Sequence, residues 1–336
     1  MKKLLFTILF LGLVSSCNND TISNQTEESP NTLTTSTSAN MANKRTCISD
    51  EIRKQDLQSN PELVQKMNAL EANTDNFIKK LQAGKVLADG TIEIPVVVNV
   101  IYRTSAENIS DARIAEQIAV LNADFGGINS DANKVPTEFQ SVKANDTKIK
   151  FRLANIVRKS STKTSWTGHT MKQSSQGGID ATTPSNYLNI WLVGTIASTR
   201  GITLGFATFP ESAGAWNDGV VIATQFFGKT GATAPFNLGR TATHEVGHYL
   251  NLRHIWGDAY CGNDLVDDTP TQQADNSGQP SYPLYQVCGG VSRSVMFMNY
   301  MDYVNDAAMF MFSAGQRVRM QSVVASSGAR AGLRVL

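Results

Sequence analysis

Hydrophobic patterning predicts a folded domain that begins near residue 91. The run TIEIPVVVNVIY at 91–102 consists largely of β-branched residues and is typical of a buried strand. Ser110 then precedes a segment with apolar residues at helical spacing, which predicts a capped helix. Further strands are expected at 148–157, 187–193 and 219–223, and helices at 237–250 and 313–325. The helix after Ser110 carries its apolar stripe at Ile114, Ile118, Leu121 and Phe125. Strands interspersed with helices indicate an α/β or α+β domain.

A separate segment, 46–88, precedes this domain. Its apolar residues are spaced for one or two amphipathic helices, and the turn sequence Ala88-Asp89-Gly90 closes it. The apolar positions are Leu63, Met67, Leu70, Phe77, Ile78 and Leu81. We interpret 46–88 as a propeptide and 89–336 as the main domain.

The first residues are predicted to direct export rather than to fold. Two lysines and a short apolar run make residues 1–16 a signal peptide. The sequence VSSC, ending at Cys17, resembles a bacterial lipobox and implies cleavage before Cys17 and lipidation of its thiol. An ordinary secretory signal is the alternative. Residues 17–45 are rich in Ser, Thr and Asn, which predicts a flexible tether. We therefore expect an outer-membrane or cell-surface lipoprotein, or an extracellular protein once the propeptide is cleaved.

Composition limits the classes of partner. The 336 residues are 41% hydrophobic and 18% charged, which suffices for a sizeable core, and the net charge is +1. This balance gives no electrostatic case for nucleic acid, and we expect membrane contact only through the N-terminal lipid.

The segment HEVGHYLNLRH at 244–254 contains three of the four histidines. On a helix, His244 and His248 project from one face, as two ligands of one metal ion must. Glu245 is placed to take a proton from a water on that metal. His254 can join them only if the chain turns near Asn251, where the HExxHxxGxxH pattern of metzincins has glycine. Asparagine tolerates the left-handed conformation, so the turn is feasible. Three nitrogen ligands leave a fourth zinc position free, as in catalytic sites.

A methionine turn is expected beneath these histidines. Residues 298–303 read MNYMDY, some fifty positions downstream. Met301 fits the turn, and Tyr303 follows it by two residues. The alternative for Met301 is core packing, and the alternative for Tyr303 is a surface aromatic.

From about Ile92 to Gln321 the sequence resembles the pappalysins, a family of metzincin metallopeptidases, and particularly their small bacterial and archaeal, ulilysin-like members. The matching stretches are SDARIAEQIAVLNADF, YLNIWLVG, LGFATFP, DGVVI, HEVGHYLNLRHIWGD, DDTP and NYMDY. The resemblance implies a twisted, mostly parallel five-stranded sheet with a backing helix, an active-site helix and an irregular C-terminal subdomain. It also implies zinc endopeptidase activity, with Glu245 as general base and Tyr303 as donor to the oxyanion. The strand near 204–209 is expected to form the cleft edge to which substrate pairs.

The cysteines other than Cys17 suggest two further devices. Cys261 and Cys288 can pair in an exported protein, stabilising it by roughly 3 kcal/mol, and similar pappalysins carry a disulfide here. Cys47, in KRTCISD, is left over at the start of the propeptide. A thiolate is a good zinc ligand, and some pappalysins are kept latent by such a cysteine switch. A surface thiol or an intermolecular disulfide are the alternatives.

The loop NDLVDDTP at 263–270 concentrates oxygen ligands that suit calcium. The resemblance implies a calcium site, for which we select Asp264, Asp268 and Thr269, with Asp267 as a further candidate. An acidic, solvated turn is the alternative.

Together these features predict an exported zinc endopeptidase, made as a latent precursor that its own propeptide inhibits, with proteins or peptides as substrates. Some similar enzymes prefer a basic residue after the scissile bond, and Asp302 or Asp306 could form the corresponding pocket. A non-catalytic surface lipoprotein with structural zinc, an adhesin or binding module, is the alternative from another class.

Overall fold

The computed structural model describes residues 44–83, 90–199 and 201–334. The predicted signal peptide, Cys17 and most of the predicted tether lie outside these residues. Within the described part, no helix is both long and apolar enough to cross a membrane.

A five-stranded sheet in the order β2-β1-β3-β5-β4 forms the centre of the fold. Four strands are parallel, and the edge strand β4 runs antiparallel to β5. The strands are β1 (Ile92–Tyr102), β2 (Ile149–Ser160), β3 (Leu188–Val193), β4 (Gly205–Ala207) and β5 (Val220–Ala223). The residues of β3, β4 and β5 are all buried, as their continuous apolar runs predict. The expected mostly parallel five-stranded sheet is confirmed.

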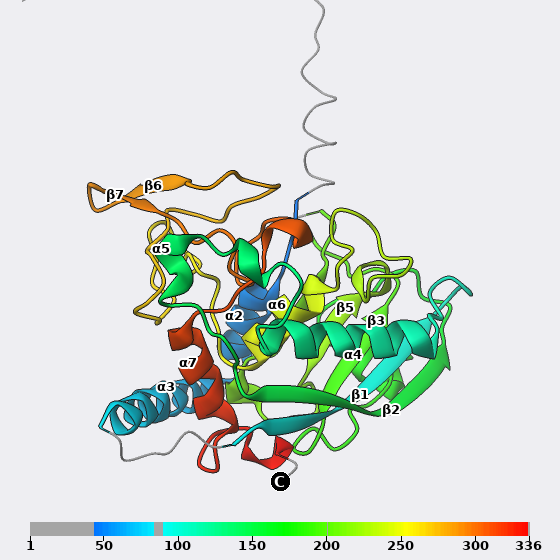
Figure 1. Cartoon of the computed structure of the whole chain (residues 1–336). Helices are drawn as coiled ribbons and strands as arrows, with labels where there is room; N and C mark the ends of the chain where they lie inside the picture. The colour runs from blue at the N-terminus through cyan, green and yellow to red at the C-terminus, as the bar shows by residue number, and fades with distance from the viewer. Residues whose placement is uncertain (1–43, 84–89, 200, 335–336) are drawn as a thin grey trace, which may run out of the picture.

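Two helices, α4 (Asp111–Phe125) and α6 (Arg240–Tyr249), pack against this sheet (Figure 1). The backing helix α4 is capped by the Ser110 hydroxyl, which accepts a hydrogen bond from Arg113 N at 3.2 Å. It packs against β2 and against α6, all of whose residues are buried.

The chain after α6 is mostly irregular. It contains a hairpin of β6 (Tyr285–Cys288) and β7 (Val291–Ser294) and the helix α7 (Ala314–Val324). The hairpin lies at the edge of the molecule, at the upper left of Figure 1. Ser313 and Gln316 form a capping box at the start of α7. A disulfide joins Cys261 to Cys288, the last residue of β6 before the hairpin turn, as expected. A short helix, α5 (Thr137–Gln140), lies earlier in the chain.

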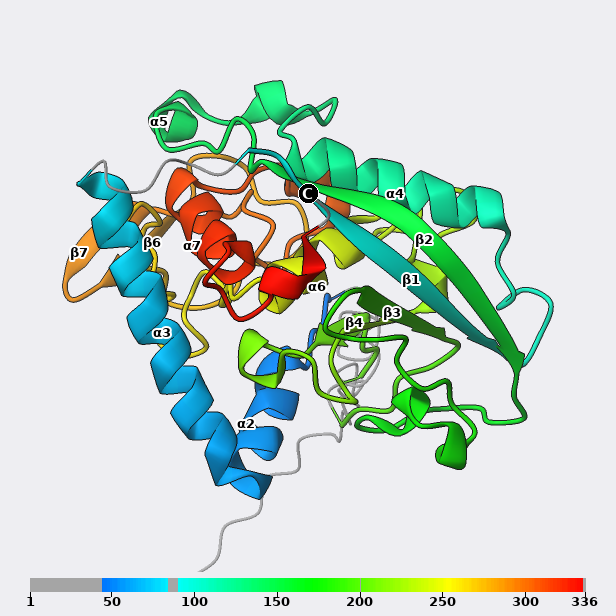
Figure 2. The same cartoon turned by 90° about the horizontal axis from the view of Figure 1, so that it is seen from below.

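The N-terminal segment packs on the domain as two helices, α2 (Ser49–Ser59) and α3 (Pro61–Gln82). Figure 2 shows α3 alongside α7 and α2 close to β4. Glu71 of α3 forms a bidentate ion pair with Arg319 of α7, both oxygens lying 2.7 Å from Nη2. The apolar spacing predicted α3 but not α2, since α2 buries only Ser49 and Ile52 among its residues.

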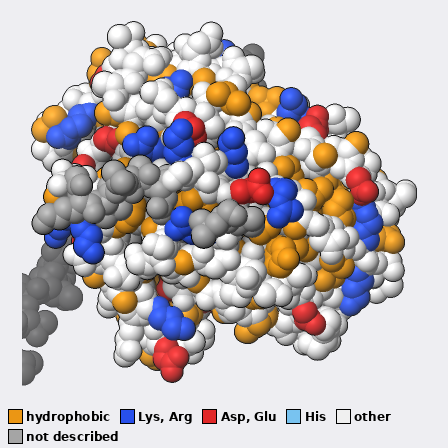
Figure 3. All heavy atoms as spheres, turned by 60° about the horizontal axis from the view of Figure 1, so that its bottom comes forward, with side chains coloured by type: hydrophobic (Ala, Val, Ile, Leu, Met, Phe, Trp, Pro, Cys, Tyr) orange, Lys and Arg blue, Asp and Glu red, His pale blue; other side chains and the backbone are white. Residues whose placement is uncertain are grey.

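The face in Figure 3 carries acidic and basic side chains interspersed with one another. This distribution agrees with the small net charge of +1.

Candidate metal centre and active site

Three histidines converge in the interior of the domain. His244 and His248 extend from one face of α6, and His254 follows after a turn. The Nε2 atom of His248 lies 3.2 Å from that of His244 and 3.0 Å from that of His254. Two nitrogens bound about 2.0–2.1 Å from one tetrahedral zinc would lie roughly 3.3 Å apart, so the spacing fits that ion.

The outer nitrogen of each ring is already engaged. His244 Nδ1 donates to the Tyr300 carbonyl at 2.7 Å, and His248 Nδ1 donates to the Leu252 carbonyl at 2.8 Å. His254 Nδ1 is bonded to the Asp258 carboxylate. Carbonyl oxygens only accept, so the proton of these rings is on Nδ1 and bare Nε2 lone pairs face one another. This donor set requires a cation at its centre.

The turn that returns His254 to the site occurs at Asn251, whose φ is +74°. The left-handed residue expected there is therefore present. Arg319 Nε donates to the Asn251 carbonyl at 2.8 Å, which fixes the turn against α7.

Met301 lies directly beneath α6. A Cβ atom at Gly247, between the two helix histidines, would come within 2.4 Å of the Met301 sulfur. Glycine at 247 therefore permits the close approach of the methionine turn, and the preceding residue, Tyr300, supplies the carbonyl that orients His244.

Cys47, from the segment preceding α2, completes the cluster. Its sulfur and the three histidine nitrogens all lie within 4.8 Å of one another, and all four residues are buried. Burial and the charge of Glu245 raise the pKa of the Cys47 thiol well above its usual value. Burial and the neighbouring imidazoles lower the pKa of His244 well below its usual value. A bound cation would reverse the first effect by stabilising the thiolate.

Glu245 and Tyr303, beside the cluster, contact the same N-terminal segment as the histidines. Glu245 Oε2 lies 3.3 Å from Cys47 Sγ and accepts a hydrogen bond from the Ser49 hydroxyl at 3.0 Å. Burial raises the pKa of Glu245 to about 7. The Tyr303 hydroxyl donates to the Cys47 carbonyl at 2.9 Å. Glu245 and Tyr303 therefore both face Cys47, as do the three histidines.

Comparison with known proteins identifies relatives of this chain by sequence. The family model described as pregnancy-associated plasma protein-A matches residues 173–325. An extracellular metalloprotease of Uncinocarpus reesii is 32% identical over 75% of this chain and 84% of its own length. One from Verticillium alfalfae is 32% identical over 72% and 79%, respectively. This chain belongs to the pappalysin family of metzincin metallopeptidases. It is accordingly a metallopeptidase, and its family implies zinc.

Solved structures of another pappalysin, mirolysin of Tannerella forsythia, match the fold. The mature enzyme with a cleaved peptide is 42% identical, covering 74% of this chain and 97% of that one, with a TM-score of 0.69. A glutamate-to-alanine mutant of promirolysin is 38% identical and covers 86% of this chain and 97% of that one, with a TM-score of 0.77. The precursor form thus matches more of this chain than the mature form does.

In this pappalysin the N-terminal segment occupies the edge of the cleft. Leu204 N donates to the Thr46 carbonyl at 2.9 Å, and Cys47 forms a parallel bridge with Gly205 of β4. The stretch 204–209, which we expected to pair with substrate, thus pairs with residues 46–48 along the start of β4.

Arg45, which the sequence assigns to the flexible tether, is only 1% exposed. Its guanidinium lies 2.5 Å from Asp306 Oδ1 and 5.0 Å above the Phe236 ring centre. Asp302, the other candidate for a basic pocket, instead accepts hydrogen bonds from Asn276, Gln272 and Tyr303 N. Of the two carboxylates, the structure gives an arginine partner to Asp306.

The acidic loop is arranged around two separate carboxylates. Asp264 is buried and accepts from the Thr269 hydroxyl at 2.8 Å, whereas Asp268 accepts from Ser313 and Gly315 at the start of α7. Asp267 is exposed. The described part of the chain does not gather three of these carboxylates into one metal-spaced group, so the calcium site stays a prediction.

Sequence reasoning missed Ser49, Arg45 and Asp258 as parts of the site. Asp258 had a detectable signal, because it follows His254 by four residues and metal-bound histidines usually donate to a carboxylate or carbonyl. Ser49 and Arg45 had none, since their partners are 196 and 261 positions away.

Proposed function

We propose that the chain is the latent precursor of an exported zinc endopeptidase, in which residues 46–88 are the propeptide. The supporting observation is that two residues of this segment, Cys47 and Ser49, close the site. Cys47 contributes its sulfur to the histidine cluster and its carbonyl to Tyr303, and Ser49 binds Glu245. Because the family establishes a metallopeptidase, the alternative of a non-catalytic binding module is set aside.

The catalytic roles follow from the atoms that the propeptide covers. His244, His248 and His254 would hold zinc, which supplies a Lewis acid that polarises a carbonyl and makes water acidic near neutral pH. Glu245, freed of Cys47 and Ser49, takes the proton of the attacking water and passes it to the leaving amine. The Tyr303 hydroxyl donates to the oxyanion of the substrate, in place of the Cys47 carbonyl. Met301 supports the histidines without taking part in the chemistry.

Export is supported by the relatives, several of which are named extracellular metalloproteases. We retain Cys17 as the lipidated residue of a surface-anchored precursor, with release on propeptide cleavage. Mass spectrometry of the N-terminal peptide from the producing cell decides this, since a diacylglyceryl adduct on Cys17 is expected and an unmodified thiol would refute it.

Asp306 is proposed to bind a basic side chain directly after the scissile bond. Arg45 occupies its pocket now, two residues before Cys47. Arg45 lies on the N-terminal side of Cys47, whereas the basic residue of the substrate lies on the C-terminal side of the scissile bond. A substrate that places this residue in the same pocket must therefore run in the opposite direction to the N-terminal segment. It would then pair antiparallel to β4, whereas residues 46–48 pair parallel. This reversal explains how a segment that crosses the centre escapes cleavage.

The test follows the precursor, residues 18–336, as it ages on a gel in the presence of casein. We expect the wild type to trim its N-terminus and digest casein, and phenanthroline to stop both until zinc is restored. New N-termini should begin with Arg or Lys. Folded, zinc-loaded protein that has lost its propeptide and cuts nothing would overturn the endopeptidase proposal.

The pocket variant in this assay is Asp306→Asn. Removing the charge that faces a buried arginine should lower kcat/KM for peptides with Arg after the scissile bond by about 100-fold. The matched control is Asp302→Asn, whose carboxyl is bonded to amides and should not set this preference. An equal loss in both variants would remove the specificity role of Asp306.

A calcium ion at Asp264, Asp268 and Thr269 is proposed as a stabilising ligand. Burial raises the pKa of Asp264 to about 7, and the hydrogen bonds to its carboxylate come from Thr269 and Val266 N. A bound cation would favour its ionised form. Saturating calcium should raise the melting temperature of the wild type by roughly 5–10 °C and that of Asp264→Asn by much less. Equal shifts would rule this loop out.

A further inference from the structure

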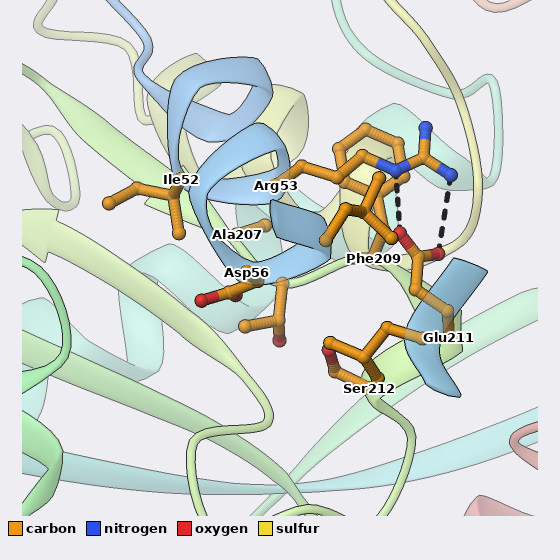
Figure 4. Close-up of a pocket in the computed structure, with 10 residues that line it drawn as sticks. Ile52, Arg53, Asp56, Ala207, Phe209, Glu211 and Ser212 are labelled. Carbon is orange, nitrogen blue, oxygen red and sulfur yellow. Dashed lines mark hydrogen bonds and ion pairs between the residues drawn. The ribbon is translucent and has the colours of Figure 1, made fainter. Parts of the chain in front are cut away.

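A second arginine of the N-terminal segment, after Arg45, is bound beside the metal centre. Arg53, on α2, places Nε 2.5 Å and Nη2 3.3 Å from the two oxygens of Glu211, which lies on the 3₁₀ turn Pro210–Ser212. The guanidinium carbon lies 4.1 Å from the ring centre of Phe209. Figure 4 shows Arg53 extending over Phe209 to meet the Glu211 carboxylate. A carboxylate and an aromatic face together are well suited to guanidinium recognition.

This pocket belongs to the cleft rather than to the outer surface. Phe209 follows the edge strand β4, and its ring centre lies 5.3 Å from that of the cluster residue His248. The wall is completed by Ala207 of β4 and by Ile52 of α2. Removing the propeptide therefore opens the pocket toward the metal centre.

The N-terminal segment supplies both the ion-pair partner of Glu211 and part of its cover. Glu211 is 5% exposed, and its bidentate partner comes from 158 positions earlier in the chain. The nearby Arg330 is itself paired with Asp218, whose charge is the main cause of its raised pKa. Removing the propeptide takes away Arg53 together with α3, which packs against the turn that carries Glu211. It leaves a carboxylate beside Phe209 with which a basic residue of a substrate can pair.

We propose that Phe209 and Glu211 form an arginine-binding subsite for residues that precede the scissile bond, and that Arg53 is its placeholder in the precursor. This inference rests on the proposed function. Along the N-terminal segment, Arg45 lies in the Asp306 pocket, Cys47 at the metal centre and Arg53 in the Glu211 pocket, in that order. A substrate runs in the opposite direction to this segment and places the basic residue after its scissile bond in the Asp306 pocket. The residues before its scissile bond must then lie near Glu211.

The distance sets the position along the substrate. From Cys47 to Arg53 the chain makes two extended steps and about four helical ones, roughly 12 Å in all. An extended peptide covers this distance in about three to four residues. The preferred arginine therefore lies about three or four residues before the scissile bond.

The experiment uses enzyme matured from the full precursor, by itself or by limited trypsin treatment. A peptide set keeps Arg after the scissile bond and moves either Arg or citrulline, its neutral isostere, through the four preceding positions. We expect kcat/KM to favour Arg over citrulline at least about tenfold at one position in the wild type, and within about twofold in Glu211→Gln. Glu93→Gln, whose partner Arg152 is an exposed residue on β2, should retain the wild-type preference.

The subsite and the peptidase proposal fail separately. Cleavage of the set with equal rates for Arg and citrulline at every position overturns the subsite and leaves the peptidase intact. If the protein cuts no peptide, binding is measured instead, on the Glu245→Ala variant matured with trypsin. Equal dissociation constants for the Arg and citrulline peptides would overturn the subsite there too. A Glu211→Gln variant that matures faster but keeps the Arg preference would show that Glu211 only anchors the propeptide.

Discussion

Glu245→Ala is expected to lower kcat on casein and on peptides at least about 10³-fold while the protein keeps its zinc. The Glu245 carboxylate bonds to Cys47 and Ser49, whereas the inward nitrogens that would hold the metal belong to the three histidines. Removing Glu245 therefore deletes the proton acceptor and spares the ligands. A loss of about 10³ corresponds to roughly 4 kcal/mol of transition-state stabilisation, within the range of a general base.

Two readouts separate this role from a structural one. Zinc content per folded molecule should equal that of the wild type in Glu245→Ala and should fall in His254→Ala, where a ligand is lost. The turnover of both should be low. A Glu245→Ala enzyme that cleaves at the normal rate would refute the general-base assignment, and one that loses its zinc would make Glu245 a ligand instead.

The local parts of the site were predictable from sequence because local physics specifies them. Helical spacing placed His244 and His248 on one face, and the left-handed turn needed near Asn251 appears there with φ at +74°. The strand patterns predicted β1 and β3 because β-branched runs reveal burial on both faces. The position of Met301 followed from the family pattern, but its contact with Gly247 required the fold.

The parts that could not be predicted depend on pairing over long sequence separations. Arg45 looks like the end of a polar tether until Asp306 is placed beside it. Helix α2 has a weak apolar pattern because it fills the cleft largely through polar contacts, such as Ser49 with Glu245 and Arg53 with Glu211. No periodicity within the segment signals such contacts, since each depends on a partner more than 150 residues away.

In the proposed latent precursor, these long-range contacts divide latency into two layers. Cys47 and Ser49 close the chemistry itself, by occupying the histidine cluster, Tyr303 and Glu245. Outside that centre, Arg45, Arg53 and Glu71 dock the segment through the ion pairs with Asp306, Glu211 and Arg319. In this proposal docking alone keeps the segment near, whereas the Cys47 thiol determines whether the centre is open.

Cys47→Ala is therefore expected to shorten the half-time of precursor conversion at least about tenfold while the precursor still folds. The substitution removes the sulfur from the cluster and leaves the Cys47 position paired with Gly205 and docked by the three ion pairs. Loss of one bond to the metal worth 1.4 kcal/mol or more suffices for a tenfold larger open fraction. Conversion is followed on a gel, beside peptide cleavage by the unprocessed protein.

Cys47→Ser sharpens the interpretation, because a hydroxyl keeps the size of the thiol but is a poor zinc ligand. It should convert nearly as fast as Cys47→Ala, and the helix-end control Ser59→Ala should convert like the wild type. If Cys47→Ser stays latent while Cys47→Ala activates, packing and not ligation closes the site. If neither variant changes the half-time, Cys47 is a buried thiol without a switch function, and the docking contacts of Arg45, Arg53 and Glu71 carry latency.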